Sequence, residues 1–204
     1  MRKLLALLFV AGLFTLVVPS AHAIVDPDPD GIGVYFDLNA DITEIMVPAA
    51  VPFYAYAILT NPTGGDIWGY EFSRIFSVPP GMEGMLYMLE RIWHGVNDGI
   101  TPVEPPDLGG NVMAGISPPL PVAPTVILVT WQFMLLTPMV VDCYVGPSTG
   151  DFGTTGRLVY ETATGPVPMH VSSGDPALKV ATVNGTGVVA VETTTFGALK
   201  ALYR

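Results

Sequence analysis

The chain has 204 residues, half of them hydrophobic and 13% charged, with 18 acidic side chains against 8 basic ones. The net charge of −10 argues against binding to nucleic acid or to anionic membrane surfaces, since both require clustered cations. Cations are the expected ligands of such a surface. With a single cysteine, Cys143, no intramolecular disulfide can form, and the apolar run around it predicts a buried, unreactive thiol.

The first 23 residues have the pattern of a secretory signal peptide. Arg2 and Lys3 form its positive start, "LLALLFVAGLFTLVV" is its apolar middle, and Ala21-His22-Ala23 is a small-x-small cleavage site. The apolar run is shorter than the roughly 20 residues that a membrane span requires. We therefore expect cleavage before Ile24, a mature chain without a membrane span, and a location that is secreted, periplasmic or at the cell surface.

Removal of the leader leaves 181 residues with a net charge of −12, the size of one domain. The mature chain is rich in β-branched and aromatic residues and is interrupted by Pro and Gly at short intervals, which predicts many short strands joined by turns. The expected strands are 32–38, 51–60, 67–77, 126–135, 139–145, 156–160 and 178–183. No repeat is visible, so we predict an all-β, antiparallel β-sandwich of about seven to nine strands.

Two segments leave alternatives open. The turn "NPTGG" joins the strands of residues 51–77 either as a hairpin or as a connection between sheets. In "PPGMEGMLYMLERIWHGVNDG", residues 79–99, the apolar positions fit both a helix and a strand, and a strand is the interpretation we favour over 82–95. If the segment were helical, Glu90, His94 and Asp98 would share one face as a metal trio, although Asp98 reads more simply as part of a turn.

The predicted domain organisation has four parts: a signal peptide (1–23), an acidic, proline-rich lead-in (24–31), the β-sandwich domain (32–183) and a C-terminal tail (184–204). The tail follows an Asn-Gly turn and ends in "FGALKALYR", which carries two cations on an otherwise acidic chain. It is either a sorting, docking or assembly element or a last strand or helix that covers the sandwich.

Several of these motifs are similar to known proteins. "NPTGG" leading to "IWGYEFS", with the later "VILVTWQFML", resembles the cohesin-like and immunoglobulin-like sandwiches of secreted bacterial proteins. "DPDPDGIGVYFD", "NPTGGDIWGYEF" and "FGALKALYR" together resemble a group of exported proteins from environmental bacteria. The resemblance implies a cohesin-like sandwich. Cohesins bind dockerin modules through a sheet face, but no residue of this sequence matches a dockerin-contact motif.

The stretch "DPDPDGIGVYFD" is a candidate calcium loop. Asp26, Asp28, Asp30 and Asp37 occupy positions 1, 3, 5 and 12 of an EF-hand-type pattern, and Gly31 stands at position 6. Against this, Asp37 is shorter than the usual Glu, the two prolines favour extended backbone, and no flanking helix is expected. The other interpretation is an extended acidic lead-in to the first strand. Calcium is the one cofactor the sequence suggests.

Signs of catalysis are weak. "GISPP" lacks the second glycine of a G-x-S-x-G elbow, and a triad of Ser172 or Ser173 with His170 is not selected by any motif. His94 and His170 are the only histidines beyond the leader, which excludes a three-histidine zinc site. We therefore expect no enzyme activity.

Aromatic residues offer a further candidate site. They form either a stacking surface for sugars or packing within the sandwich, and they are Trp68, Trp93, Trp131, Tyr54, Tyr56 and Tyr70. The sequence thus predicts an exported, non-catalytic module for adhesion, scaffolding or cell-surface assembly, with a protein or glycan partner. A carbohydrate- or calcium-binding module is the alternative, and a secreted hydrolase is a distant third.

Overall fold

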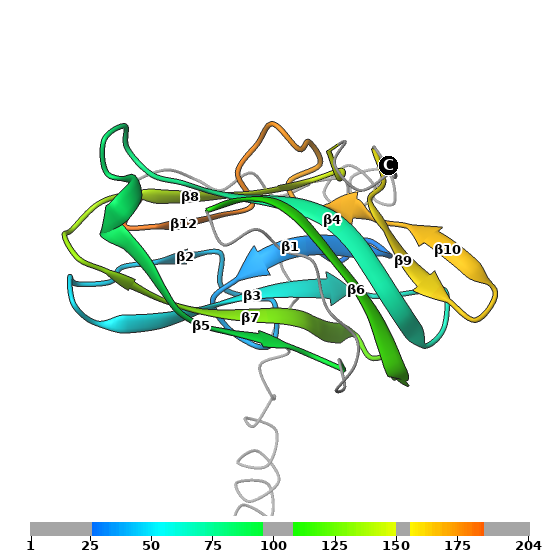
Figure 1. Cartoon of the computed structure of the whole chain (residues 1–204). Helices are drawn as coiled ribbons and strands as arrows, with labels where there is room; N and C mark the ends of the chain where they lie inside the picture. The colour runs from blue at the N-terminus through cyan, green and yellow to red at the C-terminus, as the bar shows by residue number, and fades with distance from the viewer. Residues whose placement is uncertain (1–25, 96–107, 150–155, 186–204) are drawn as a thin grey trace, which may run out of the picture.

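The computed structural model describes residues 26–95, 108–149 and 156–185. These residues form twelve strands and one short 3-10 turn, Glu83–Met85 (η2), and the strands build two stacked sheets (Figure 1). The structure therefore confirms the predicted all-β sandwich, with more strands than the seven to nine expected and with two parallel pairings among the antiparallel ones. The predicted signal peptide, Asp98 and residues 186–204 of the predicted tail lie outside the described residues.

Sheet A has the strand order β11-β1-β3-β7-β5. All its pairings are antiparallel except that of β1 with β11, which is parallel. The strand bounds are His170–Val171 (β11), Gly31–Tyr35 (β1), Pro52–Thr60 (β3), Thr125–Leu135 (β7) and Leu86–Trp93 (β5).

Sheet B has the order β10-β9-β4-β8-β12-β2, and β6 pairs with the other edge of β4. Along the shared edge of β4, residues 69–71 pair with β9 and residues 73–77 pair with β8. The strand bounds are Gly165–Pro168 (β10), Val159–Thr162 (β9), Ile67–Ser77 (β4), Val141–Gly146 (β8), Ala181–Val183 (β12), Glu44–Ile45 (β2) and Gly109–Leu120 (β6).

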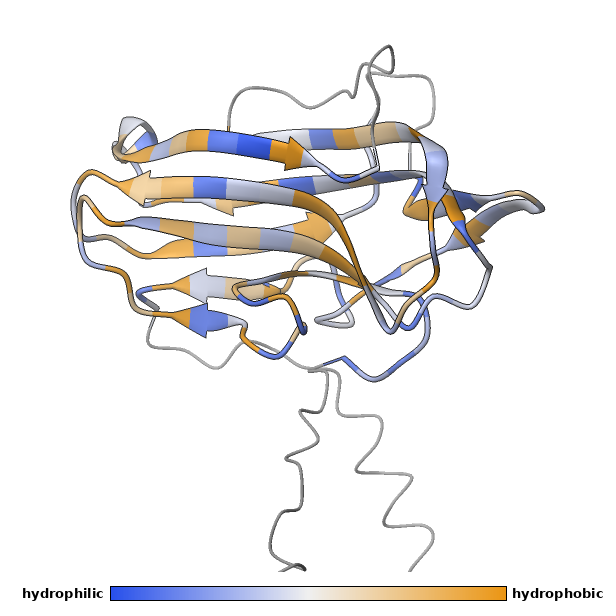
Figure 2. Ribbon diagram, turned by 90° about the horizontal axis from the view of Figure 1, so that it is seen from below, coloured by the Kyte–Doolittle hydropathy of each residue, from blue (hydrophilic) through white to orange (hydrophobic). Residues whose placement is uncertain are grey.

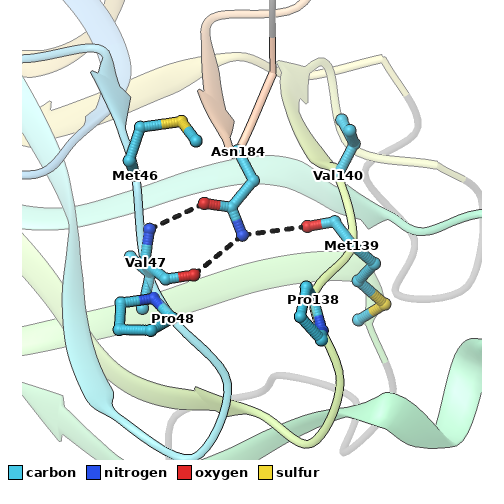
Figure 3. Close-up of a pocket in the computed structure, with 7 residues that line it drawn as sticks. All are labelled: Met46, Val47, Pro48, Pro138, Met139, Val140 and Asn184. Carbon is cyan, nitrogen blue, oxygen red and sulfur yellow. Dashed lines mark hydrogen bonds between the residues drawn. The ribbon is translucent and has the colours of Figure 1, made fainter.

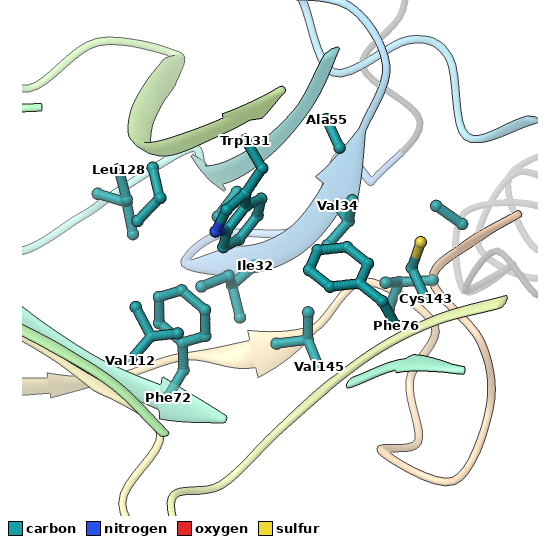
Figure 4. Packing of buried hydrophobic residues seen from close by; sticks show 14 of the residues in the cluster. Ile32, Val34, Ala55, Phe72, Phe76, Val112, Leu128, Trp131, Cys143 and Val145 are labelled. Carbon is teal, nitrogen blue, oxygen red and sulfur yellow. The ribbon is translucent and has the colours of Figure 1, made fainter. Parts of the chain in front are cut away.

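The core lies between the sheets because side chains alternate along each strand. In the pairing of β3 with β7, Ala55 and Trp131 are opposite each other and buried, while the next pair, Tyr54 and Gln132, faces outward. From sheet B, the Phe76 ring meets the fully buried Trp131 edge-on at 5.2 Å between ring centroids (Figure 4). Figure 2, seen from below, shows the resulting bands of hydrophilic and hydrophobic residues along the strands.

The structure decides between the alternatives that the sequence left open for two segments. The connection after residue 60 leads from sheet A to sheet B, so residues 51–77 are a sheet-to-sheet connection and not a hairpin. Asn61 and Gly65 both have positive φ there, 47° and 98°, which suits Asn and Gly in a tight reversal. The segment 82–95 contains η2 and then β5, which confirms the favoured strand interpretation.

Strand β6 was not predicted, although it is one of the longest. Its sequence contains three glycines and, just before its last residue, Pro118 and Pro119, and both residue types are turn signals. Because β6 pairs only with β4, it is an edge strand, and proline is tolerated where no ladder hydrogen bond is needed. The same holds for β10, an edge strand with prolines at two of its four positions.

The first regular strand, β1, begins at Gly31, and the last, β12, ends at Val183. Asn184 continues directly from β12 and is hydrogen-bonded to the sandwich. Within the described segments no helix has the length and apolar character needed to cross a membrane.

Cys143 on β8 faces the core and is 1% exposed. Burial, with a smaller contribution from the charge of Asp142, raises the pKa of the thiol, so it stays protonated at neutral pH. We expect no reaction with DTNB in native buffer and reaction of the one thiol after unfolding in guanidinium, measured by absorbance. Rapid reaction of the native protein would show that the thiol is accessible.

Candidate functional site

Three of the four predicted calcium ligands lie before or at the start of β1, but the four do not share one set of contacts. Asp30 accepts hydrogen bonds from the Thr63 backbone N–H (2.8 Å), the Thr63 hydroxyl (2.7 Å) and the Tyr160 hydroxyl (2.7 Å). Asp37 accepts from three backbone N–H groups of the loop that follows β1, at 2.8 to 3.1 Å. The carboxylates of Asp30 and Asp37 therefore stabilise the loops that they contact. Calcium binding by the full set stays a prediction.

Asp26 and Asp28 instead meet His170 of β11. Asp26 Oδ2 lies 3.0 Å from His170 Nε2, and Asp26 Oδ1 accepts from the Asp28 backbone N–H at 3.2 Å. Among the described residues these three form the group of potential ligand side chains, with one ligand atom from each lying within 4.8 Å of the others. Asp26 is completely buried, whereas Asp28 and His170 are half-buried. The cluster is therefore anchored inside and open on one side.

Two glycines of β1 make room for this cluster on the outer face of sheet A. A Cβ on Gly31 would lie 2.2 Å from Asp26 Oδ2 and 2.5 Å from the Thr60 hydroxyl. Gly31 is also the residue that pairs with His170 across the parallel β1–β11 ladder. The carboxylate of Asp26 thus sits directly over backbone, at a point where any other residue would displace it.

Tyr35 completes the cluster from the other end of β1. Its ring turns back along the strand, since a Cβ on Gly33 would lie 2.9 Å from Tyr35 Cε2 and 2.4 Å from the Ser172 hydroxyl. The Tyr35 hydroxyl is buried and makes no hydrogen bond of normal geometry. Burial and then the negative charge of Asp26 raise the pKa of Tyr35, while the neighbouring Ser172 hydroxyl opposes the shift. The phenol is therefore neutral.

The sequence favoured neither the helical metal trio nor a catalytic triad, and their described residues make other contacts. Glu90 lies in the strand β5 and His94 is the first residue after it, in a turn, so the two do not share a helical face. His94 Nε2 lies 2.9 Å from the Thr130 hydroxyl, and burial lowers the pKa of His94. The Ser173 hydroxyl donates to the carbonyls of Asp175 and Leu178.

The six aromatic candidates are divided between the core and two different surfaces. Trp131 and Tyr70 are buried, and Trp93 stacks on Tyr70 with 6.5 Å between ring centroids. Trp68 is exposed on β4 of sheet B, while Tyr54 and Tyr56 stack on each other on sheet A at 6.2 Å. Trp131, Tyr70 and Trp93 therefore have a packing role, and the six residues do not form one sugar-binding platform.

The outer face of β3, β7 and β5 carries a set of large exposed side chains, which we call the outer strip. Its members are Tyr54, Tyr87, Leu89 and Ile92, between 41% and 57% exposed. The register places Tyr54, Gln132 and Glu90 in one row and Ile92, Thr130 and Tyr56 in the next. Gln132 Nε2 donates to the Tyr54 hydroxyl at 3.0 Å, which orients the ring. Leu89 stands at a β-bulge of β5.

A shallow apolar groove of about 430 Å³ lies between the end of β2 and the start of β8 (Figure 3). It is lined by Met46, Val47, Pro48, Pro138, Met139, Val140 and Asn184. Asn184 bridges its two walls: its side chain accepts from the Val47 N–H at 2.6 Å and donates to the carbonyls of Val47 and Met139 at 2.9 and 3.2 Å. The amide is a structural clamp at this end of the sandwich.

Comparison with known proteins identifies the fold as that of cohesin modules. The sixth cohesin of scaffoldin B from Acetivibrio cellulolyticus, solved with a dockerin, matches with a TM-score of 0.51 and 8% identity over 77% of this chain and 99% of that chain. A type I cohesin of Clostridium thermocellum, also solved with a dockerin, matches with a TM-score of 0.50 and 9% identity over 76% of this chain and 98% of that chain. No family model and no curated protein matches the sequence. The chain is therefore a cohesin-like β-sandwich.

Sequence reasoning did not connect His170 with the acidic lead-in, because the two are 144 residues apart. Tyr35 was also missed, since a tyrosine in a strand is ordinarily packing. The signal that was available is the spacing Gly31-x-Gly33: glycine weakens a strand and often marks a close approach of another group. Here that group is a carboxylate on one glycine and a phenol ring on the other.

The close approach of Asp26 to Gly31 generates a stability prediction. Gly31→Ala is expected to lower the free energy of unfolding by about 1 to 3 kcal/mol, because the added methyl group must displace Asp26 or Thr60. Gly84→Ala is the matched control: a Cβ there has no neighbour within 4 Å, so the expected change is below about 0.5 kcal/mol. Urea unfolding of both variants measures the difference. Equal stabilities would contradict the close approach.

A second prediction concerns the clamp. Asn184→Ala is expected to lower the free energy of unfolding by about 2 to 4 kcal/mol, because it leaves the Val47 N–H without its partner and places alanine at a φ of 54°. Asn184→Gly, which tolerates that φ, is expected to recover about 1 kcal/mol of the loss. Thermal unfolding of the two variants separates the hydrogen bonds from the backbone conformation.

Proposed function

We propose that this protein is an exported, non-catalytic β-sandwich module that binds a protein partner in adhesion, scaffolding or cell-surface assembly. The fold supports the proposal: the two cohesins that it resembles were solved in complexes with dockerin proteins. Because identity to them is below a tenth, that support extends to the kind of scaffold, and the contact residues must come from this chain.

The outer strip is the observation that carries the proposal. Four large side chains, two of them tyrosines, stand exposed on one sheet face, whereas such residues are usually scattered singly on a monomer. Tyrosine is enriched where binding energy concentrates, and Glu90 and Gln132 supply polar partners in the adjacent row. The strip is supported from beneath by the fully buried Trp131 and Phe133, which makes it a rigid platform.

Two candidate nucleophiles, the Cys143 thiol and the Ser173 hydroxyl, support the non-catalytic part of the proposal. The Cys143 thiol is buried with a raised pKa, and the Ser173 hydroxyl donates to backbone carbonyls. Export rests on the predicted signal peptide. The proposed location, secreted, periplasmic or at the cell surface, therefore follows from residues 1–23 alone, and Edman sequencing of the protein from native cells tests it by starting at Ile24.

Site-specific photocrosslinking tests the binding face. A benzoylphenylalanine in place of Tyr87, which is 57% exposed on sheet A, is expected to capture one discrete protein in native cells. The matched control replaces Ile75, which is 51% exposed on β4 of sheet B. Capture from both positions alike, or from neither, would contradict a partner on the outer strip.

The captured partner then allows an affinity measurement. Replacing Tyr87 and Ile92 together by serine is expected to weaken binding about 30-fold or more, because loss of a central aromatic contact typically costs about 2 kcal/mol. Both side chains are exposed, so the melting temperature should change little. Unchanged affinity in this variant, measured by calorimetry, places the partner elsewhere.

A further inference from the structure

We propose that Asp26, Asp28 and His170 bind a divalent transition-metal ion such as Zn²⁺, which fastens the segment before β1 to β11. This site is independent of the proposed protein-binding function. It also differs from the predicted calcium loop, since it contains a histidine and contains neither Asp30 nor Asp37.

The geometry brings three suitable ligand atoms together. Asp26 Oδ2 and His170 Nε2 are 3.0 Å apart, and one carboxylate oxygen of Asp28 lies within 4.8 Å of both. Two ligands at about 2.1 Å from a tetrahedral zinc ion are separated by about 3.4 Å, so a small movement of the half-buried Asp28 completes the site. The ion takes the position that the shared proton of the Asp26–His170 hydrogen bond otherwise holds.

The buried Tyr35 hydroxyl is the second observation. It is fully buried and has no hydrogen-bond partner of normal geometry, although the Ser172 hydroxyl is close, and its ring covers Gly33, two residues along β1 from the Gly31 position that Asp26 covers. Catalytic and surface zinc sites with three protein ligands hold water in the fourth position, and ligating carboxylates are themselves hydrogen-bonded. When the ion is bound, the Tyr35 hydroxyl can donate a hydrogen bond either to a metal-bound water or to the Asp26 carboxylate in its metal-bound position.

The donor set selects the class of metal. Calcium takes six to eight oxygen ligands and does not favour imidazole, whereas one imidazole with two carboxylates suits zinc and neighbouring transition metals. Asp26 and His170 are 144 residues apart, so an ion that links them stabilises the folded chain at the free edge of sheet A. The expected melting temperature rises by about 5 to 10 °C at a hundredfold excess of zinc over its dissociation constant.

Titration calorimetry and equilibrium dialysis of the untagged protein with Zn²⁺ test the proposal. We expect one equivalent to bind to the wild type. His170→Gln and Asp28→Asn are each expected to raise the dissociation constant about a hundredfold, and Tyr35→Phe about tenfold, as for the loss of an outer-shell partner.

The controls separate this site from its alternatives. His94→Gln removes the other histidine of the predicted mature chain and is expected to leave zinc binding unchanged. Asp30→Asn and Asp37→Asn, which lie in the predicted calcium loop, are also expected to retain zinc. If His170→Gln fails to fold, Asp28→Asn still tests the site, because Asp28 is half-buried.

Three results would overturn the proposal. They are a wild type that takes up no zinc, zinc uptake that persists unchanged in both His170→Gln and Asp28→Asn, and tighter binding of Ca²⁺ than of Zn²⁺ with dependence on Asp30 and Asp37. The last result would establish the calcium loop in its place. None of these outcomes bears on crosslinking through the outer strip, so the two proposals fail separately.

Discussion

The pairing of β3 with β7 is the constraint on which the rest of the sandwich depends. Its register runs from Pro52 opposite Met134 to Thr60 opposite Thr125, with one irregularity after Ala57. Because side chains alternate, this register decides at once that Trp131 and Phe133 enter the core and that Tyr54 and Tyr56 stand outside. A slip of one residue would exchange the two sets, exposing the largest core side chain. The core and the proposed binding face are therefore two consequences of one register.

The same alternation acts on β1 with a different outcome. Ile32 and Val34 enter the core, so Gly31, Gly33 and Tyr35 must face outward. An outward face of two glycines would leave backbone uncovered, and the chain covers it with its own acidic lead-in and with the Tyr35 ring. That arrangement buries a carboxylate, which requires compensating partners. The Asp28 N–H and His170 are the partners of the Asp26 carboxylate. The lead-in from Asp26 onward is therefore held against the sheet.

The sequence was informative where physical signals are local. Alternation located the strands that became β3, β4 and β7, and the Asn-Pro-Thr-Gly-Gly turn located the reversal between the sheets. Strand β6 was missed because proline and glycine carry a turn signal that only its position at a sheet edge overrides. The calcium pattern grouped four aspartates by spacing, whereas the structure pairs two of them with a histidine supplied by a parallel strand. Spacing describes contacts within a loop, whereas the pairing of β11 with β1 joins residues that are far apart in the sequence.

The cluster and the outer strip occupy one face of one sheet, and the neighbouring strands β1 and β3 connect them. Tyr35 of β1 is opposite Tyr56 of β3, and the Tyr56 ring stacks on Tyr54 of the outer strip with 6.2 Å between ring centroids. The strip members on β5 lie three strand spacings from β1, about 14 Å, which exceeds the distance over which substitutions usually couple. On the same face, Ala40 of the loop after β1 packs with Tyr35 and Ile58 in a small apolar group. Asp37 holds that loop by three backbone hydrogen bonds, so the loop is fixed beside the cluster. Within the strip, Tyr54 is therefore the member placed to couple with the cluster, and the members on β5 are expected to act independently of it.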